Sequence, residues 1–411
     1  MTVPLSRNRN YHLLWGSQAL SEFGINASMI AFPLLVLSLT GSAAASGLVL
    51  GTSAAAALLV GLPAGALVDR WNRKKIMLSC EAAQALATAS LVVALLWDVA
   101  SVAHIVVVAA VIGVCAALFE PAEEACLPNL MPAEQLSTAV AMNSARGHLG
   151  QLSGTAAGGF LFAVGRFAPF AVNVLTHTMA FFFLLFLRMP PRKVQPEPVG
   201  GHLRREIAVG LRWMWRQRPV RVIGLFAVVL NLFFTAYFIV IIVVAQAKGV
   251  PSGEIGIMAA MFGVGGILGS LAAPYLHRMV SPYLSIIGVF WALTALTPLA
   301  VFVSNGYLMG ALFGGMAFLA PTANTTIETY QLLLTPDELR GRMNAAMGVV
   351  IGVAGVVGPA LAGVLMEVVS GNYAVLLCTA GIGVVTLFAT LSPTLRNFPR
   401  HAAVEVLPTT T

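Results

Sequence analysis

The chain alternates long apolar runs with short polar interruptions over almost its whole length. An α-helix needs about 20 residues to cross a hydrocarbon layer of about 30 Å, and each run is close to that length or longer. The pattern therefore predicts an all-α membrane protein with twelve membrane-spanning helices. Their expected ranges are 12–37, 43–66, 76–97, 103–123, 137–163, 168–188, 222–246, 254–276, 283–303, 307–330, 343–366 and 373–392.

One connection is far longer than the rest and divides the chain. Residues 189–221 begin with several prolines and glycines and continue as a basic, amphipathic run from Leu203 to Arg218. Six predicted spans precede this segment and six follow it. We therefore expect an N-terminal six-helix bundle in 1–188, a central cytoplasmic loop with an amphipathic basic helix in 189–221, and a C-terminal six-helix bundle in 222–411.

The two parts also repeat one another in sequence. A single constant shift carries Gly154 onto Gly358 and Lys74 onto Arg278. Parallel repeats of this kind build transporters from two bundles, with the substrate site between them near the middle of the bilayer. The sequence therefore predicts two pseudo-symmetric six-helix bundles.

The basic residues are distributed unevenly about the predicted spans. When the N-terminus is placed in the cytoplasm, all 23 Lys and Arg residues except Arg166 and Lys248 fall on the cytoplasmic side, Arg146 among them. Such a bias sets the orientation of membrane proteins, so we expect both termini in the cytoplasm. The net charge of +7 then faces anionic lipid rather than a nucleic acid. The excess of arginine over lysine, with abundant alanine, fits a GC-rich bacterial genome, and we expect the protein in the bacterial inner membrane.

Composition narrows the functional classes. Hydrophobic residues make up 58% of the chain and charged residues 9%, against about 25% charged in a soluble domain. The four cysteines lie singly in apolar surroundings, without the spacing of a metal site. The sequence has neither a phosphate-binding glycine loop ending in Lys-Ser/Thr nor a nucleophile elbow. We therefore expect no enzyme activity, no cofactor and no metal.

The first span carries a polar stripe. Gln18, Glu22 and Asn26 follow one another at intervals of four residues and therefore share one helix face. Glu22 is expected near the middle of the bilayer, where an ionisable group costs about 3 kcal/mol and marks a functional cavity. The stripe predicts a site of proton or substrate coupling. The alternative is a protonated Glu22 that is hydrogen-bonded to a neighbouring span.

The polar turn between the second and third spans is the most distinctive motif. It reads Gly65-Ala-Leu-Val-Asp69-Arg70-Trp71-Asn72-Arg73-Lys74. This run resembles the signature loop of the major facilitator superfamily, Gly-x-Leu-x-Asp-Arg-x-x-Arg-Lys, with Asn72 where the family more often has Gly. The resemblance implies a two-bundle fold that transports by alternating access.

In that family the basic residues of the loop latch onto acidic groups when the cytoplasmic side is closed. The resemblance implies that Arg73 pairs with Glu123 or Glu124, and that Asp69 caps the span starting near Gly341. The latch candidates, including those of the repeat, are Gly65, Asp69, Arg70, Arg73, Lys74, Glu120, Glu123, Glu124, Arg278 and Glu328. Exporters of this family often carry an Arg near the Glu120 position, and this chain has none there. The alternative is a solvated acidic cluster that balances nearby arginines.

The fifth span contains closely spaced small residues. They form the run Gly150-x-x-x-Gly154-Thr155-x-x-Gly158-Gly159. This run resembles the antiporter motif of facilitator exporters, Gly-x-x-x-Gly-Pro-x-x-Gly-Gly, with Thr155 in place of Pro. Small residues on one face let helices approach closely and bend. The motif favours export over import; ordinary close packing is the alternative.

Further polar residues within the predicted spans are candidates for lining a cavity. They are Asn173, His177, Asn231, Tyr237 and Asn324. An imidazole changes charge near neutral pH, so His177 is a candidate for sharing the proton. A hydrogen bond between helices is the alternative for His177, and Asn231 and Asn324 are equally ambiguous.

The order of local motifs resembles one branch of the superfamily, the bacterial exporters of macrolides, tetracyclines and siderophores. Leu13-Leu14-Trp15, Pro121-Ala122 and Glu206-x-x-x-Gly210-Leu211-Arg212-Trp213 are among the runs that carry this resemblance. It implies a proton-coupled exporter of small amphipathic molecules. A metabolite uniporter or symporter is the runner-up, and a non-transporting membrane scaffold or sensor comes third. We expect a monomer whose partners are a small-molecule substrate, protons and the lipid bilayer.

Overall fold

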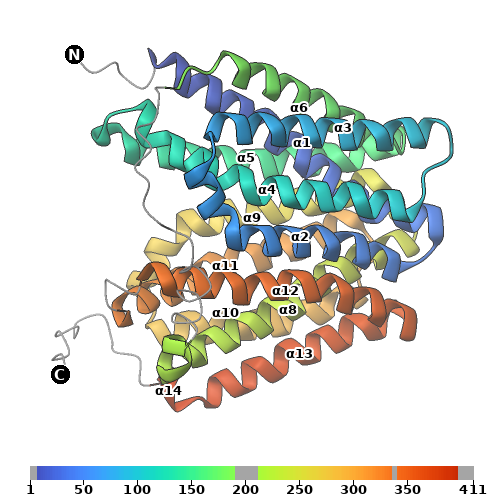
Figure 1. Ribbon diagram of the computed structural model, residues 1–411. Coiled ribbons are helices and arrows are strands. Elements are labelled where there is room, and N and C mark those ends of the chain that lie inside the picture. Colours follow the sequence, from blue (N-terminus) through green and yellow to red (C-terminus); the bar gives the residue numbers. More distant parts are fainter. Residues whose placement is uncertain (1–6, 190–211, 336–339, 397–411) are drawn as a thin grey trace.

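The computed structural model describes residues 7–189, 212–335 and 340–396. In these ranges the chain forms long helices, and no strands, that lie roughly side by side (Figure 1). The elements are α1 (Arg9–Thr40), α2 (Ala43–Arg70), α3 (Arg73–Leu96), α4 (Val102–Leu130), α5 (Ala133–Val164), α6 (Ala168–Phe186), α8 (Arg218–Ala247), α9 (Ser252–Met279), α10 (Pro282–Leu296), the 3₁₀ segment η2 (Thr297–Val301), α11 (Gly306–Leu334), α12 (Arg340–Val368), α13 (Gly371–Leu391) and α14 (Pro393–Arg396).

The twelve predicted spans are confirmed as helices, and their ends agree within about one turn except at α10 and α4. The span predicted to end at residue 303 is α-helical only to Leu296 and continues to Val301 as η2. Helix α4 runs on to Leu130 through Pro121 and Pro128, well past the predicted end at residue 123. Prolines are tolerated inside membrane helices because neighbouring groups satisfy the main-chain oxygens that they leave without a donor. Glu123 and Glu124 therefore lie within the helix, whereas the sequence placed them at its end.

Eleven of the described helices are long and apolar enough to cross a membrane. α5 is not among these, because its sequence is rich in glycine and polar residues. Most of the amphipathic helix predicted in the central loop falls in residues 190–211, which lie outside the described ranges.

The same helix pairs pack together in the two halves. In the first half α1 contacts α5 and α6, while α4 contacts α2 and α3. In the second half α8 contacts α12 and α13, while α11 contacts α9 and α10. The predicted pair of pseudo-symmetric six-helix bundles is therefore confirmed.

The halves meet where α2 packs on α12 and α5 packs on α9. We call the end of the molecule where α1 begins and α14 ends the terminal end, and the opposite end the distal end (Figure 1). Toward the distal end, Gly159 of α5 lies against the backbone of Gly256 in α9, and Gly47 of α2 against that of Pro359 in α12. Toward the terminal end, Gly65 of α2 faces open space. The closest contacts between the halves are therefore distal.

Candidate functional site

A cavity of about 340 Å³ lies within the first half, between α1, α3, α4 and α5. Carboxylates from three of these helices line it: Glu22, Glu81, Glu120, Glu123 and Glu124. Among the described lining residues, Arg146 is the one that carries a permanent positive charge. So many carboxylates in one concave site give it a negative potential that attracts cations.

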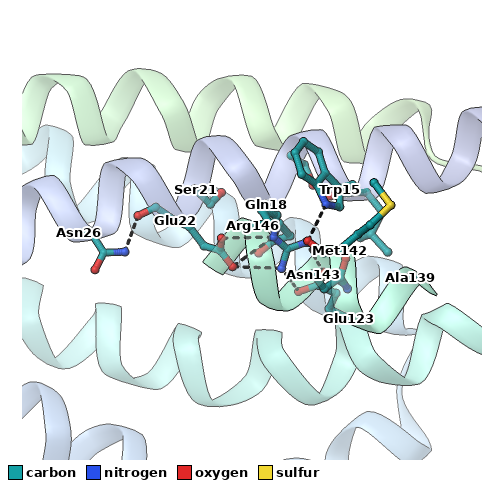
Figure 2. A network of polar contacts seen from close by, with 12 residues as sticks. Trp15, Gln18, Ser21, Glu22, Asn26, Glu123, Ala139, Met142, Asn143 and Arg146 are labelled. Carbon is teal, nitrogen blue, oxygen red and sulfur yellow. Dashed lines mark hydrogen bonds and ion pairs between the residues drawn. The ribbon is translucent and has the colours of Figure 1, made fainter. Parts of the chain in front are cut away.

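Arg146 lies at the centre of this acidic lining and joins three helices. Its guanidinium, carried by α5, contacts Glu22 of α1 at 3.0 Å and Glu123 of α4 at 2.7 Å. Figure 2 shows the three side chains converging from their separate helices. Asn143 of α5, one turn before Arg146, donates to the Glu123 carboxylate at 3.4 Å. The arrangement fixes both carboxylates on one cation.

The Glu22–Arg146–Glu123 group does not balance its own charge. The Arg146 and Glu123 side chains are only 6% and 9% exposed, and that of Glu22 is 24% exposed. Two ionised carboxylates against one guanidinium leave an excess of one negative charge. Groups withdrawn from water retain such an excess only when a proton or another cation compensates it.

The glycines of α5 explain why Arg146 can reach Glu22. Gly150 and Gly154 follow Arg146 at intervals of four residues, so all three share the helix face that meets α1. A Cβ atom on Gly150 would lie 2.8 Å from Cβ of Glu22, and one on Gly154 would lie 2.5 Å from the main-chain oxygen of Phe23. Close approach of α1 and α5 therefore requires glycine at these positions.

A second buried pair borders the cavity on the other side of α1. The Nδ1 atom of His177, in α6, lies 2.6 Å from Oε2 of Glu81, in α3. Ser21 and Gln18 of α1 donate hydrogen bonds to Oε1 of Glu81, at 2.9 and 3.4 Å. Ser21 precedes Glu22 in sequence, so the two polar groups are adjacent on α1.

Comparison with known families identifies the fold that carries this site. A family model described as a transmembrane secretion effector matches residues 2–408. The chain belongs to this family of major facilitator transporters. The predicted superfamily is thereby confirmed, and the chain is a multi-pass membrane transporter of small molecules rather than an enzyme.

Relatives of this facilitator transporter include named efflux pumps. It is 27% identical to the multidrug efflux pump Tap of Mycolicibacterium fortuitum, over 84% of this chain and 86% of that protein. It is 22% identical to macrolide efflux protein A of Streptococcus pyogenes, over 88% of this chain and 91% of that protein. These relatives are consistent with the predicted exporter branch.

Solved structures show the same fold at lower identity. The nucleoside transporter NupG has a TM-score of 0.74 and 12% identity, over 95% of this chain and 100% of that one. A bacterial homologue of the human lysosomal transporter Spinster has a TM-score of 0.71 and 16% identity, over 95% and 97%. At such identity the likeness concerns the fold alone.

The three residues of the predicted stripe have different partners in this transporter. Glu22 lines the cavity as expected and is bound by Arg146. Gln18 is buried and reaches Glu81, whereas the Asn26 amide donates to the main-chain oxygen of Glu22, at 2.8 Å. The stripe is therefore divided: Glu22 and Gln18 belong to different polar groups, and Asn26 bonds within its own helix.

Of the remaining cavity candidates, two lie in the first half and are buried. His177 is bound to Glu81, and Asn173 donates to the Ser28 hydroxyl at 3.1 Å. The predicted alternative for His177, a contact between helices, thus involves an ionisable partner.

The other three candidates lie in the second half, away from this cavity. Tyr237 is fully buried among aromatic rings and donates to the main-chain oxygen of Thr297 at 3.0 Å. The Asn231 amide donates to Ala227 within its own helix, and Asn324 is exposed on α11.

The signature loop makes contacts with main-chain groups. Arg73 donates to the main-chain oxygen of Ala125 in α4. Lys74 donates to the main-chain oxygens of Leu185 and Leu187, at 2.8 and 2.7 Å, where α6 ends. A lysine at this position satisfies oxygens that lack a helical partner and complements the helix dipole.

On the acidic side of the predicted latch, Glu123 is bound by Arg146. The pairing of Arg73 with Glu123 or Glu124 stays a prediction. Glu120 and Glu124 are exposed residues that line the cavity. Arg70 is exposed at the end of α2. The side chains of Asp69, Arg278 and Glu328 lie outside the described residues, so the cap near Gly341 and the second latch stay predictions.

Sequence reasoning missed three residues of the site. It assigned Arg146 to the cytoplasmic surface, and the structure corrects this assignment, since Arg146 is 5% exposed inside the first half. The interval of four that links Arg146 to Gly150, Gly154 and Gly158 was a usable signal. Glu81 and Gln84 carried the same signal as Glu22, a polar group within an apolar span.

Proposed function

We propose that this protein exports small amphipathic molecules, such as drugs, natural products or siderophores, from the cytoplasm in exchange for protons by alternating access. The observation that carries the proposal is the excess negative charge of the Glu22–Arg146–Glu123 group beside the cavity. The relatives named as efflux pumps support the direction of transport.

Either a proton or a cationic substrate can compensate that charge, but not both at once. An uncompensated buried charge costs several kcal/mol, so the group holds a proton when the cavity is empty. A cation that enters the cavity releases this proton, and a returning proton expels the cation. We assign the exchangeable proton to Glu22, because its side chain is 24% exposed and can exchange a proton with the cavity. The Glu123 side chain is only 9% exposed.

The same charge selects among the candidate substrates. The carboxylates of the lining attract cationic amphipathic molecules and repel anions, so amines fit the cavity better than negatively charged siderophores. The proton gradient drives export, since each charge that crosses 100 mV contributes about 2.3 kcal/mol.

Orientation and movement complete the proposal. Both termini lie in the cytoplasm of a bacterial inner membrane, and the protein acts as a monomer. Residues 1–188 and 222–411 form the two bundles that rock against each other, and 189–221 link them. Since the closest contacts between the halves are distal, the described state is closed toward the periplasm. The signature loop and the glycines of α5 act in the switch to the opposite state.

The test is efflux of a fluorescent lipophilic cation, such as ethidium, from loaded cells with and without a protonophore. We expect Glu22→Gln to abolish efflux that depends on the proton gradient. Asp98→Asn is the matched control: it removes an exposed carboxylate, and Asn tolerates the positive φ of 55° at that position. The control variant should export like the parent.

Four results would contradict the proposal in different ways. Efflux by the parent that persists with the protonophore indicates a uniporter. Proton-driven uptake of the cation indicates a symporter. Unchanged efflux by Glu22→Gln removes Glu22 from the mechanism, and the absence of any transport favours a scaffold or sensor.

A further inference from the structure

The Glu81–His177 pair is almost fully withdrawn from water. The two side chains are 1% and 0% exposed. Without an added proton the pair would consist of a carboxylate and a neutral imidazole, and this buried negative charge would be strongly unfavourable. One proton makes the pair neutral, and the contact of 2.6 Å is that of a charge-assisted hydrogen bond.

Gln84 provides an independent sign that this part of the cavity receives a ligand. It lies one turn after Glu81 on the same face of α3, lines the cavity and is 2% exposed. Its Oε1 atom is buried and has no hydrogen-bond partner among the described residues. A buried acceptor of this kind is rare unless a donor arrives from elsewhere. An ammonium group is such a donor.

The charges around the pair come from α1, α4 and α5, each of which packs against α3 or α6. α1 contributes Glu22, α5 contributes Arg146, and α4 contributes three carboxylates. The charged residues that line the cavity beside Glu81 are therefore Glu22, Glu120, Glu123, Glu124 and Arg146. Carboxylates outnumber cations in this set, so a second positive charge in the cavity is electrostatically favourable.

We propose that Glu81, His177 and Gln84 form a second cation subsite, which a proton occupies until the second ammonium group of a dicationic substrate replaces it. This subsite rests on the proposed function, since the first ammonium group replaces the proton of Glu22. The second proton leaves the His177 imidazolium for water, and the imidazole remains neutral. The ammonium group then supplies the positive charge beside Glu81 and donates to Oε1 of Gln84.

The number of protons released on binding distinguishes this inference from a single-site exchange. We would bind primary alkylamines, and α,ω-diaminoalkanes of the same length over about four to ten carbons, to the purified full-length transporter in detergent. Calorimetry in two buffers of different ionisation enthalpy gives the number of protons released. We expect one proton per monoamine and two per diamine of suitable length.

Two variants separate the second subsite from the first. The double variant Glu81→Gln/His177→Gln leaves no unpaired buried charge, and it should release one proton with either ligand. Gln84→Leu keeps both proton sites and removes the acceptor. It should weaken diamine binding relative to monoamine binding about tenfold or more, which is the value of a hydrogen bond to a charged group.

The outcomes distinguish the second subsite from the proposed function. One proton released by the parent with both ligands overturns the second subsite and leaves the proposed function intact. No proton released with either ligand overturns both. A Gln84→Leu variant that binds diamines as tightly as the parent also overturns the subsite, even if the double variant fails to fold.

Discussion

Arg146 is the residue on which the charge of the cavity depends. It binds carboxylates from two other helices, and its side chain is 6% exposed. A buried ion pair adds little stability compared with apolar residues, but loss of one partner costs about 3–5 kcal/mol because the other charge remains buried. The arginine is therefore needed for folding as well as for coupling.

We expect Arg146→Gln to lower the free energy of unfolding by about 3–5 kcal/mol and to abolish export. The double variant Arg146→Gln/Glu123→Gln removes one charge of each sign and should recover most of the lost stability. The stabilities of the two purified variants and the parent are compared by thermal unfolding in detergent. A single variant as stable as the parent would show that the three side chains do not interact as described.

At the scale of single residues, the sequence predicts which positions belong to the site better than it predicts which residues they contact. Glu22 was predicted because a carboxylate near mid-bilayer is costly wherever its helix turns. Arg146 was not, although it lies within the expected span 137–163, because the count of basic residues assigned it to the cytoplasmic side. α5 begins at Ala133, so Arg146 lies more than three turns inside the helix. The partners of a charge also depend on which helix faces it, and hydropathy contains no such information.

At the scale of elements, α5 is the helix that assembles the site. Its glycines meet α1, and one of them, Gly159, meets α9 of the other half. The helix therefore connects the charged group to the contact between the halves. This double role gives a physical reason for the small residues of the antiporter-type motif, in which Thr155 replaces the expected Pro and donates to Gln151 within the helix.

Gly158 offers a direct test of this packing. A Cβ atom there would overlap the main-chain oxygen of Ala27 in α1, so Gly158→Ala must move the helices apart. Overpacking of this kind lowers the free energy of unfolding by about 1–3 kcal/mol. We expect the rate of export by this variant to fall as well.

Gly266→Ala in α9 is the matched control for Gly158→Ala. No described atom lies within 4 Å of the added methyl group, and alanine favours helix more than glycine does. Thermal unfolding and efflux should match or exceed those of the parent. If both glycine variants behave alike, close packing of α1 and α5 is not required.

The helices themselves could be predicted almost completely from the sequence. Eleven of the spans have the length and hydropathy that the thickness of the bilayer demands, and α5 is the exception among the twelve. The extension of α4 to Leu130 was missed, since prolines at 121 and 128 signal an end in soluble helices. That extension matters, because it places Glu123 and Glu124 within the helical wall of the cavity.

At the scale of the whole molecule, the proposed export requires the distal contact between the halves to open. Ser42, at the start of α2, donates to Glu367, near the end of α12, at 2.8 Å. The two residues belong to different halves and lie at the distal end, where Glu367 is exposed and Ser42 is half-buried. A covalent link between them would hold the described state closed.

We expect a short bifunctional thiol reagent to cross-link the Ser42→Cys/Glu367→Cys variant and to stop export. The four native cysteines are buried and should react slowly. Each single variant treated with the same reagent is the control, and a reducible linker should restore export when cleaved. Continued export by fully cross-linked protein would rule out an alternating-access movement at this contact.

The central claim is that a proton and a cationic substrate compete for the charge at Glu22, Arg146 and Glu123. The most direct test is the pH dependence of tetraphenylphosphonium binding to the purified protein. Competition predicts an affinity that falls as the pH is lowered, approaching tenfold per pH unit for one proton, and little dependence for Glu22→Gln. An affinity of the parent protein that does not change with pH would contradict the account.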